Sequence, residues 1–214
     1  MNKKILMIGG GGHCKSVLDS LLQLNQYSEI GIIDKSEYIG KCVLGIPIIG
    51  CDDDLPKLYE SGYGYAFVTV GSIGETYLRI KLFNFLEKIG FEIPDVIDSS
   101  SVISQHAIIE KGVFIGKNAV VNAGTSIGKG TIINTSSIIE HDCAIGDFVH
   151  ISPGTVLCGE VQIGANSHIG ANSVIKQCVN IGSNTTIGAG SVALNDVGSY
   201  VIAYGNPCKE VKHI

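Results

Sequence analysis

The chain has 214 residues, of which 45% are hydrophobic and 16% charged, and its formal net charge is −5. This composition supports a packed core and excludes an intrinsically disordered chain, and the lack of Lys and Arg clusters excludes nucleic acid as an expected partner. No apolar run is long enough to insert into a membrane, and the seven cysteines include no CxxC pair, which predicts reduced thiols in a cytoplasmic protein with no metal.

The first part of the chain alternates apolar runs with helical patterns. Strands are predicted at 5–8, 30–33 and 65–70, and helices at 13–25 and 75–88. A glycine turn over 9–12 joins the first strand to the first helix. We expect a small Rossmann-like βαβ domain over residues 1–95, with a parallel sheet covered on both faces.

From about residue 102 the sequence repeats every six residues. A small or β-branched residue follows four positions after each member of an almost unbroken isoleucine series. Three hexapeptides close one coil of a parallel β-helix, so residues 96–214 predict about five coils that rise roughly 4.8 Å each. The series consists of Ile103, Ile109, Ile115, Val121, Ile127, Ile133, Ile139, Ile145, Ile151, Leu157, Ile163, Ile169, Ile175, Ile181 and Ile187.

The position directly after each aliphatic residue of the series is mostly Gly or Asn. Gly116, Gly128, Gly146 and Gly164 are examples. Gly and Asn tolerate a left-handed backbone, so we interpret this column as the place where the chain turns each corner.

These repeats resemble the left-handed parallel β-helix of the hexapeptide acyltransferases, as does the tail over 205–209. With the glycine-rich N-terminal unit and the segments 138–143 and 148–151, nearly the whole chain resembles the sugar O- and N-acetyltransferases of sialic acid, bacillosamine and perosamine pathways. The resemblance implies a homotrimer with acetyl-CoA in the groove between neighbouring β-helices. It also implies direct acetyl transfer to a nucleotide-linked amino sugar, with N-acetylation of a UDP- or GDP-4-amino sugar preferred.

Acetyl transfer needs a base, and histidine is the usual base near neutral pH. His141 lies two residues after the inward Ile139, so we expect it to face outward from a strand, with Asp142 directly after it. The resemblance implies that His141 is the proton acceptor and that Asp142 raises its basicity. Some relatives carry Glu at the second position, and the shorter Asp makes the hydrogen bond to the imidazole a point to test.

The same resemblance assigns His150, Ala171 and Ala189 to acetyl-CoA binding. The two alanines are small, as a groove that follows the backbone requires, although small residues are common throughout the repeat. His168 follows His150 by one coil, so we expect it to stack above His150 in a solvent-facing or subunit-contact role.

Glycines between a strand and a helix let a phosphate approach backbone N–H groups. Such a turn also fits a dinucleotide, but the unit is short and His13 stands where small residues usually pack. The resemblance instead implies nucleotide-sugar contacts. Lys35 stands where some relatives have an acid, and Asp34 is alternatively a turn cap. The residues assigned to this site are Gly11, Gly12, His13, Asp34, Lys35 and Gly71.

Other functions fit part of the pattern. O-acetylation of sialic acid or a related sugar is the first alternative. A zinc enzyme of the carbonic anhydrase type would use His141, His150 and His168 as ligands, but it leaves the N-terminal domain without a purpose. A trimer that binds sugar nucleotides without catalysis is the third. Zinc content and the activity of a His141 variant discriminate among them.

Overall fold

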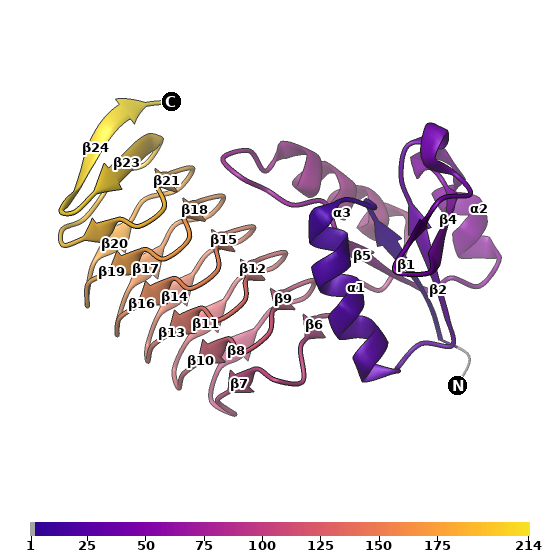
Figure 1. Cartoon of the computed structure of the whole chain (residues 1–214), viewed down its shortest axis with the longest axis horizontal. Coiled ribbons are helices and arrows are strands. Elements are labelled where there is room, and N and C mark those ends of the chain that lie inside the picture. The colour runs from indigo at the N-terminus through magenta and orange to yellow at the C-terminus, as the bar shows by residue number, and fades with distance from the viewer. Residues whose placement is uncertain (1–2) are drawn as a thin grey trace. The chain divides into compact units, whose positions relative to one another are not determined.

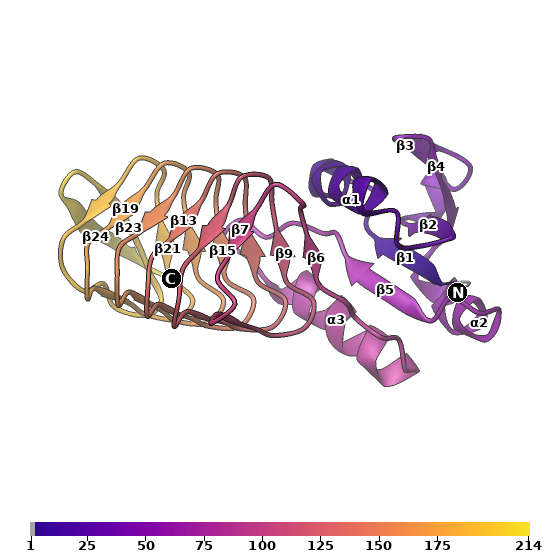
Figure 2. The ribbon, with the colours of Figure 1, turned by 90° about the horizontal axis from the view of Figure 1, so that it is seen from below.

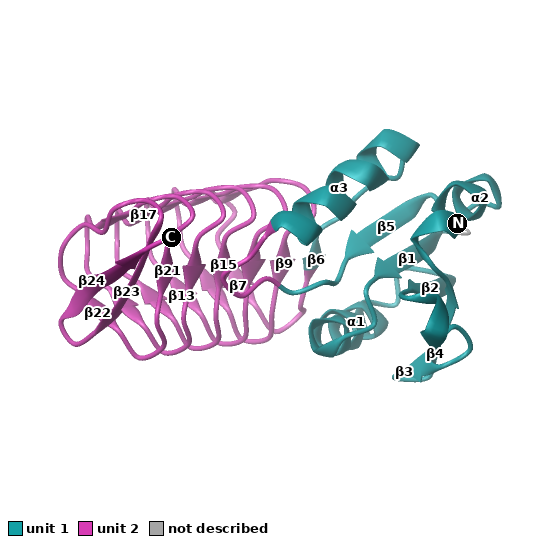
Figure 3. Cartoon of the chain, turned by 90° about the horizontal axis from the view of Figure 1, so that it is seen from above, with its two compact units in different colours: residues 1–71, 77–96 teal, residues 72–76, 97–214 magenta. Residues whose placement is uncertain are grey.

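The computed structural model describes residues 3–214 as two compact units, which Figure 3 shows in different colours. The first contains the chain up to Gly71 and Tyr77–Val96, and the second contains Ser72–Thr76 and Ile97–Ile214. The short segment Ser72–Thr76 therefore leaves the first unit and packs with the second. Within the described residues, no helix combines the length and the apolar character that a membrane span requires.

The first unit is built on a five-stranded sheet with strand order β3-β4-β2-β1-β5. The strands β1, β2 and β5 are parallel and form the centre of the sheet. Their apolar side chains, such as Leu6, Ile32 and Phe67, are fully buried. The strands are β1 (Lys4–Ile8), β2 (Glu29–Ile33), β3 (Cys42–Val43), β4 (Ile46–Gly50) and β5 (Tyr65–Val68), and the helices are α1 (Gly12–Leu24), α2 (Leu55–Glu60) and α3 (Tyr77–Ile89).

The three strands and two helices predicted for this unit are present, with ends that differ by at most two residues. The sheet is not wholly parallel as predicted, because β3 pairs antiparallel with β4. The hairpin and α2 are too short to produce a clear apolar period, which explains why the sequence pattern did not indicate them.

The second unit is a three-sided parallel β-helix (Figures 1 and 2). Val120 pairs with Ile138, and Ile138 pairs with Val156, so each coil takes eighteen residues as predicted. We name its faces I (β7, β10, β13, β16, β19, β22), II (β8, β11, β14, β17, β20) and III (β6, β9, β12, β15, β18, β21, β23, β24).

The strands of the coils are two residues long, and only the closing pair at the C-terminus is longer. The second residue of each short strand points inward. The strands are β6 (Val96–Ile97), β7 (Val102–Ile103), β8 (Ile108–Ile109), β9 (Phe114–Ile115), β10 (Val120–Val121), β11 (Ser126–Ile127), β12 (Ile132–Ile133), β13 (Ile138–Ile139), β14 (Ala144–Ile145), β15 (His150–Ile151), β16 (Val156–Leu157), β17 (Gln162–Ile163), β18 (His168–Ile169), β19 (Val174–Ile175), β20 (Asn180–Ile181), β21 (Thr186–Ile187), β22 (Val192–Ala193), β23 (Val201–Gly205) and β24 (Cys208–His213).

The interior combines the isoleucine series with buried hydroxyl groups. Ile139, for example, is fully buried in the core of the β-helix. The Ser137 hydroxyl donates to the Ser152 carbonyl at 3.0 Å, and Thr155 donates to Gly170 at 3.1 Å. Small residues with hydroxyl groups therefore fill the interior and satisfy their own hydrogen bonds from coil to coil.

The glycine column does not supply the left-handed residues, so that interpretation is wrong. From Ile109 onward, positive φ occurs three residues after each inward aliphatic residue of the series, for example at Asp142 and even at Phe148. An ideal Cβ on Gly128 would instead lie 2.7 Å from the backbone nitrogen of Asp147, in the next coil. These glycines are needed because the coils approach one another closely.

Candidate active site

His141 and Asp142 lie in the turn between β13 and β14, rather than on a strand as predicted. This turn forms the corner that joins face I to face II. Asp142 adopts φ +59°, a conformation that Asp tolerates better than most residues. The corner exposes both side chains, with 52% of His141 and 63% of Asp142 accessible.

The shorter acid does reach the imidazole. Nδ1 of His141 lies 2.9 Å from Oδ2 of Asp142. Because a carboxylate can only accept, Nδ1 donates the proton, and in the neutral ring the basic lone pair is on Nε2. The hydrogen bond to Asp142 raises the pKa of His141, and the nearby carboxylates of Glu140 and Glu160 raise it further. The pair therefore forms an oriented base at an exposed corner.

His150 and His168 stack as predicted, with ring centroids 4.9 Å apart. His168 is not solvent-facing, because each of the two residues is only 8% exposed within the protomer. Both Nδ1 atoms approach the carbonyl of Ser72, at 2.6 Å for His150 and 3.4 Å for His168. Burial lowers the pKa of His168, which favours its neutral form. The predicted contact of His150 with acetyl-CoA stays a prediction.

Ala171 and Ala189 lie one above the other on a different corner, after β18 and β21 of face III. The N–H of Gly190 donates to the Ala171 carbonyl at 2.8 Å, which shows the stacking of the two turns. The structure therefore does not bring these alanines to the same corner as His141 within one protomer.

In the first unit, the glycine turn connects β1 to the first residue of α1. Gly9 has φ +106°, and an ideal Cβ there would lie 2.7 Å from Cγ2 of Val70, so a side chain is excluded. Beyond the turn, Gly11 is the N-cap residue of α1, and it has no side chain that could cap the helix. An ideal Cβ on Gly11 or Gly12 would meet nothing within 4 Å. The space that side chains at Gly11 and Gly12 would fill is therefore open, and N–H groups in the first turn of a helix have no partner within the helix.

Asp34 fixes this glycine turn. Its Oδ2 accepts the N–H of Gly10 at 2.6 Å, and its Oδ1 accepts the N–H of Lys35 at 2.7 Å. The turn-cap alternative for Asp34 is therefore what the structure shows, although its carboxylate oxygens keep further lone pairs.

A cavity of about 560 Å³ opens at the carboxyl ends of β1, β2 and β5. Asp34, Lys35, Asp52 and Asp53 line it. Burial raises the pKa of Asp52, and the neighbouring charges of Asp53 and Asp34 add to this. The two aspartates at 52 and 53 follow a short strand that the sequence pattern missed, so they were not among the predicted residues.

Gly71 and His13 lie together in the same unit. An ideal Cβ on Gly71 would lie 3.6 Å from Cβ of His13, in ordinary van der Waals contact. His13 belongs to the first turn of α1 and is partly buried. Gly11, Gly12 and His13 thus come from the N-cap and the first turn of α1, Asp34 and Lys35 from the segment after β2, and Gly71 from the loop after β5.

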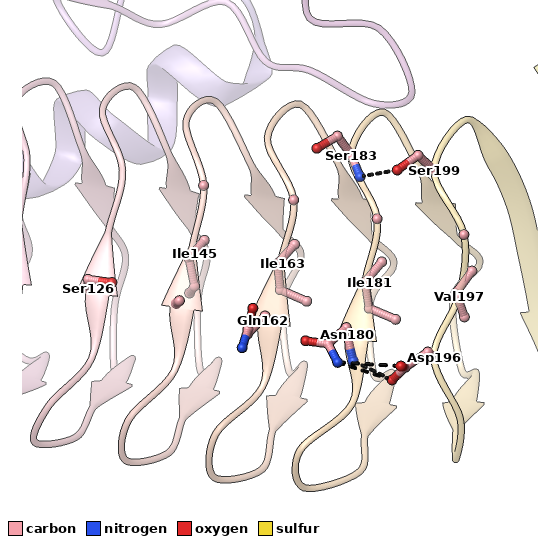
Figure 4. A pocket seen from close by; sticks show the side chains of 15 residues that line it. Ser126, Ile145, Gln162, Ile163, Asn180, Ile181, Ser183, Asp196, Val197 and Ser199 are labelled. Carbon is pink, nitrogen blue, oxygen red and sulfur yellow. Dashed lines mark hydrogen bonds between the residues drawn. The ribbon is translucent and has the colours of Figure 1, made fainter.

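Face II carries a groove of about 630 Å³ that was not among the sites predicted from the sequence. Figure 4 shows Ser126, Gln162 and Asn180 in a row along it. At one end Asp196 accepts the backbone N–H of Asn180 at 2.8 Å. Because outward residues of one face recur every eighteen positions, that spacing could have revealed this column, which also contains Ile108 and Ala144.

Face I carries the opposite character. Its outward column is wholly aliphatic, and none of its members is buried within the protomer. Val102 is 64% exposed and Val174 is 36% exposed. The His141 corner therefore separates an aliphatic face from a groove that has polar and apolar residues in its lining. We call this column the face I stripe: Val102, Val120, Ile138, Val156, Val174 and Val192.

Within residues 3–214 of one protomer, no group of three or more His, Cys, Asp or Glu side chains is arranged to hold a metal ion. The two stacked histidines belong to face III, and His141 belongs to the corner between faces I and II. The three proposed zinc ligands are therefore not brought together within one chain.

Both halves of the chain match known families. A family model described as the PglD N-terminal domain matches residues 4–86. Hexapeptide models match residues 160–195, as bacterial transferase hexapeptide, and residues 106–135, as the hexapeptide repeat of succinyl-transferase.

Similar solved structures extend over the whole chain. A histidine-to-asparagine variant of perosamine N-acetyltransferase from Caulobacter crescentus, in complex with CoA and GDP-perosamine, is 34% identical with a TM-score of 0.92, covering 98% of this chain and 97% of that one. The chain belongs to the hexapeptide-repeat sugar acetyltransferases. This membership confirms the predicted fold class, a Rossmann-like domain followed by a left-handed β-helix.

Two further members of the family are similar over their full length. The acetyltransferase domain of PglB from Neisseria gonorrhoeae, in complex with acetyl coenzyme A, is 34% identical with a TM-score of 0.89, covering 99% of this chain and all of that one. WeeI from Acinetobacter baumannii is 26% identical with a TM-score of 0.86, covering 98% of this chain and 100% of that one.

Proposed function

We propose that this sugar acetyltransferase moves an acetyl group from acetyl-CoA to the amino group of a nucleotide-linked 4-amino sugar. The observation that carries the proposal is the His141–Asp142 pair, joined at 2.9 Å on an exposed corner of the β-helix. The relatives support it, because structures among them hold CoA with GDP-perosamine, or acetyl coenzyme A.

In the proposed reaction His141 acts as the general base. The sugar nitrogen attacks the thioester carbonyl carbon, and Nε2 of His141 takes the proton that the nitrogen loses. The C–S bond then breaks, and the imidazolium returns the proton to the sulfur of CoA. Asp142 keeps the ring oriented and stabilises its charged form, which the raised pKa of His141 reflects.

We further propose that the active enzyme is a homotrimer with acetyl-CoA between adjacent β-helices. Two features support this arrangement. The face I stripe is an aliphatic surface that one protomer leaves partly exposed, as expected of a subunit contact. Ala171 and Ala189 lie on a different corner from His141, so a site that uses both corners needs a second copy of the chain.

The nucleotide part of the substrate is proposed to bind the first unit. The open N–H groups at Gly11 and Gly12 suit a phosphate, and the 560 Å³ cavity beside them offers Lys35 as a cation. We place the reaction in the cytoplasm, because the seven cysteines are all free in the structure.

A coenzyme-A release assay across a panel of UDP- and GDP-linked amino sugars tests the proposal. We expect release only with an amino-sugar acceptor, and a product that gains one acetyl group by mass spectrometry. An amide product resists mild hydroxylamine, whereas an O-acetyl ester is cleaved, which would favour the sialic acid type of reaction.

The His141→Asn variant tests the base in the same assay. We expect turnover to fall about a hundredfold or more, with unchanged binding of acetyl-CoA. A fully active variant would exclude His141 as the base. Binding of the sugar nucleotide without any release would favour the non-catalytic alternative.

A further inference from the structure

Gly159 lies directly against the imidazole of His141. It follows His141 by eighteen residues and so occupies the same corner one coil further along. An ideal Cβ on Gly159 would lie 2.5 Å from Nε2 and 2.6 Å from Cε1 of His141. Such distances are too short for any Cβ, so the ring fills the space that a side chain at residue 159 would need. Gly159 is accordingly buried although it lies in a turn.

The backbone conformation at residue 159 does not require glycine. Gly159 is absent from the residues with positive φ, so a side chain would cause no backbone strain. The same turn position carries a side chain in every other hexapeptide of the series, and alanine is common there. Those residues are Gln105, Lys111, Lys117, Ala123, Lys129, Thr135, His141, Asp147, Pro153, Ala165, Ala171, Gln177, Ser183 and Ala189.

We propose that Gly159 is a positioning residue, whose missing side chain leaves the space in which His141 holds its Nδ1 on Asp142. The inference rests on the proposed function, because it takes His141 to be the base. The partner of the pair is accommodated in the same way on the other side. An ideal Cβ on Gly124, one coil earlier, would lie 3.2 Å from Cγ of Asp142. Gly124 also has φ +75°, so its own backbone already requires glycine and it offers no clean test.

The consequence of a methyl group at residue 159 follows from what it would meet. It would meet the end of a flexible side chain and not the backbone of a neighbouring coil. The coil therefore accepts the methyl group, and the imidazole rotates away from it. Rotation breaks the hydrogen bond between Nδ1 and Asp142, which is the largest cause of the raised pKa of His141. The imidazole then titrates at lower pH and is misplaced for proton transfer.

The test is Gly159→Ala in the full-length enzyme, with Gln177→Ala as a matched control at the same turn position one coil further on. We expect kcat to fall on the order of tenfold to a hundredfold, with a smaller change in KM for acetyl-CoA. The acid limb of the pH–rate profile and the ¹⁵N NMR titration of the His141 ring should both move to lower pH. The Tm of Gly159→Ala should fall only by the small amount that displacing the ring costs, and all properties of Gln177→Ala should match the wild type.

A thermodynamic cycle adds a readout that does not depend on activity. In the His141→Ala background the ring is absent, so adding Gly159→Ala should leave the Tm unchanged. If Gly159→Ala unfolds the protein, or lowers the Tm equally with and without the ring, Gly159 serves the coil and the proposal is overturned.

The variants separate this inference from the proposed function. If His141→Asn is inactive while Gly159→Ala keeps the wild-type rate and titration, only the role of Gly159 is wrong. If His141→Asn keeps full activity, the assignment of the base fails first.

Discussion

At the residue scale, the proposed chemistry depends on one solvent-exposed hydrogen bond, between His141 and Asp142. His141 and Asp142 are both more than half exposed, so water competes for their polar atoms in a single protomer. The pair is nevertheless adjacent in sequence, and the left-handed conformation of Asp142 turns its carboxylate back toward the ring. The corner geometry thus orients the imidazole before any substrate binds.

Asp142→Asn tests the contribution of the carboxylate. The folded pKa of His141 is raised chiefly by Asp142, so the amide should let it fall toward the ordinary histidine value. The acid limb of the pH–rate profile, where protonation of His141 removes the base, should therefore move to lower pH. The rate on the plateau should fall about tenfold or more. A pH–rate profile of kcat/KM measures both effects. An unchanged acid limb would show that Asp142 does not control the base.

The sequence could identify this pair only through its resemblance to a family. Six histidines were available, and the position of His141 after an inward isoleucine showed only that it faced outward. The burial of His168 could not be predicted, because the segment Ser72–Thr76 that covers it is distant in sequence. The period of the repeat predicts the coils themselves, but it does not show which distant segment of the chain packs against them.

At the element scale, the hexapeptide repeat largely determines the β-helix. Its eighteen-residue coil was predictable because the inward isoleucines recur in a fixed register through the pairs Ile139–Leu157 and Leu157–Ile175. The hairpin of β3 and β4 was not predictable, since two- to five-residue strands with a turn give no periodic signal. The role of the glycines that follow the inward isoleucines could not be predicted either, because it depends on contacts between neighbouring coils.

Gly128→Ala tests the close approach of the coils. Its methyl group would lie 2.7 Å from backbone atoms of Asp147 and Gly146, which cannot move without disturbing the stack. We expect the free energy of unfolding to fall by about 1–3 kcal/mol, as measured by chemical denaturation. Lys176→Ala is the control, because Lys176 follows an inward isoleucine in the same way but lies on the face I corner, where the column carries side chains. Equal effects in both variants would contradict the explanation.

At the scale of the whole molecule, the proposed site is divided between corners. The base lies between faces I and II, and the predicted coenzyme alanines follow face III. In the proposed trimer a single chain would hold complementary halves of the site, and the partly exposed face I stripe offers the contact that would join them. Replacing Ile138 or Val156 by Glu should dissociate the proposed trimer, as measured by analytical ultracentrifugation, and abolish CoA release together.

Mixed trimers give a sharper test of the shared site. His141→Asn lacks the base, and Ala189→Trp blocks the predicted coenzyme groove, so each variant alone should be inactive. When the two are co-expressed in equal amounts, a site with a wild-type base on one subunit and a wild-type groove on its neighbour forms in about a quarter of random pairings. CoA release should therefore recover to about a quarter of the wild-type rate. Co-expression of His141→Asn with Asp142→Asn is the control: both alter the same corner, so no subunit pair restores it, and activity should be about half that of Asp142→Asn alone. If the mixed trimers of the first pair remain inactive, each site must be contained within one chain, and the separation of the two corners would then require another explanation.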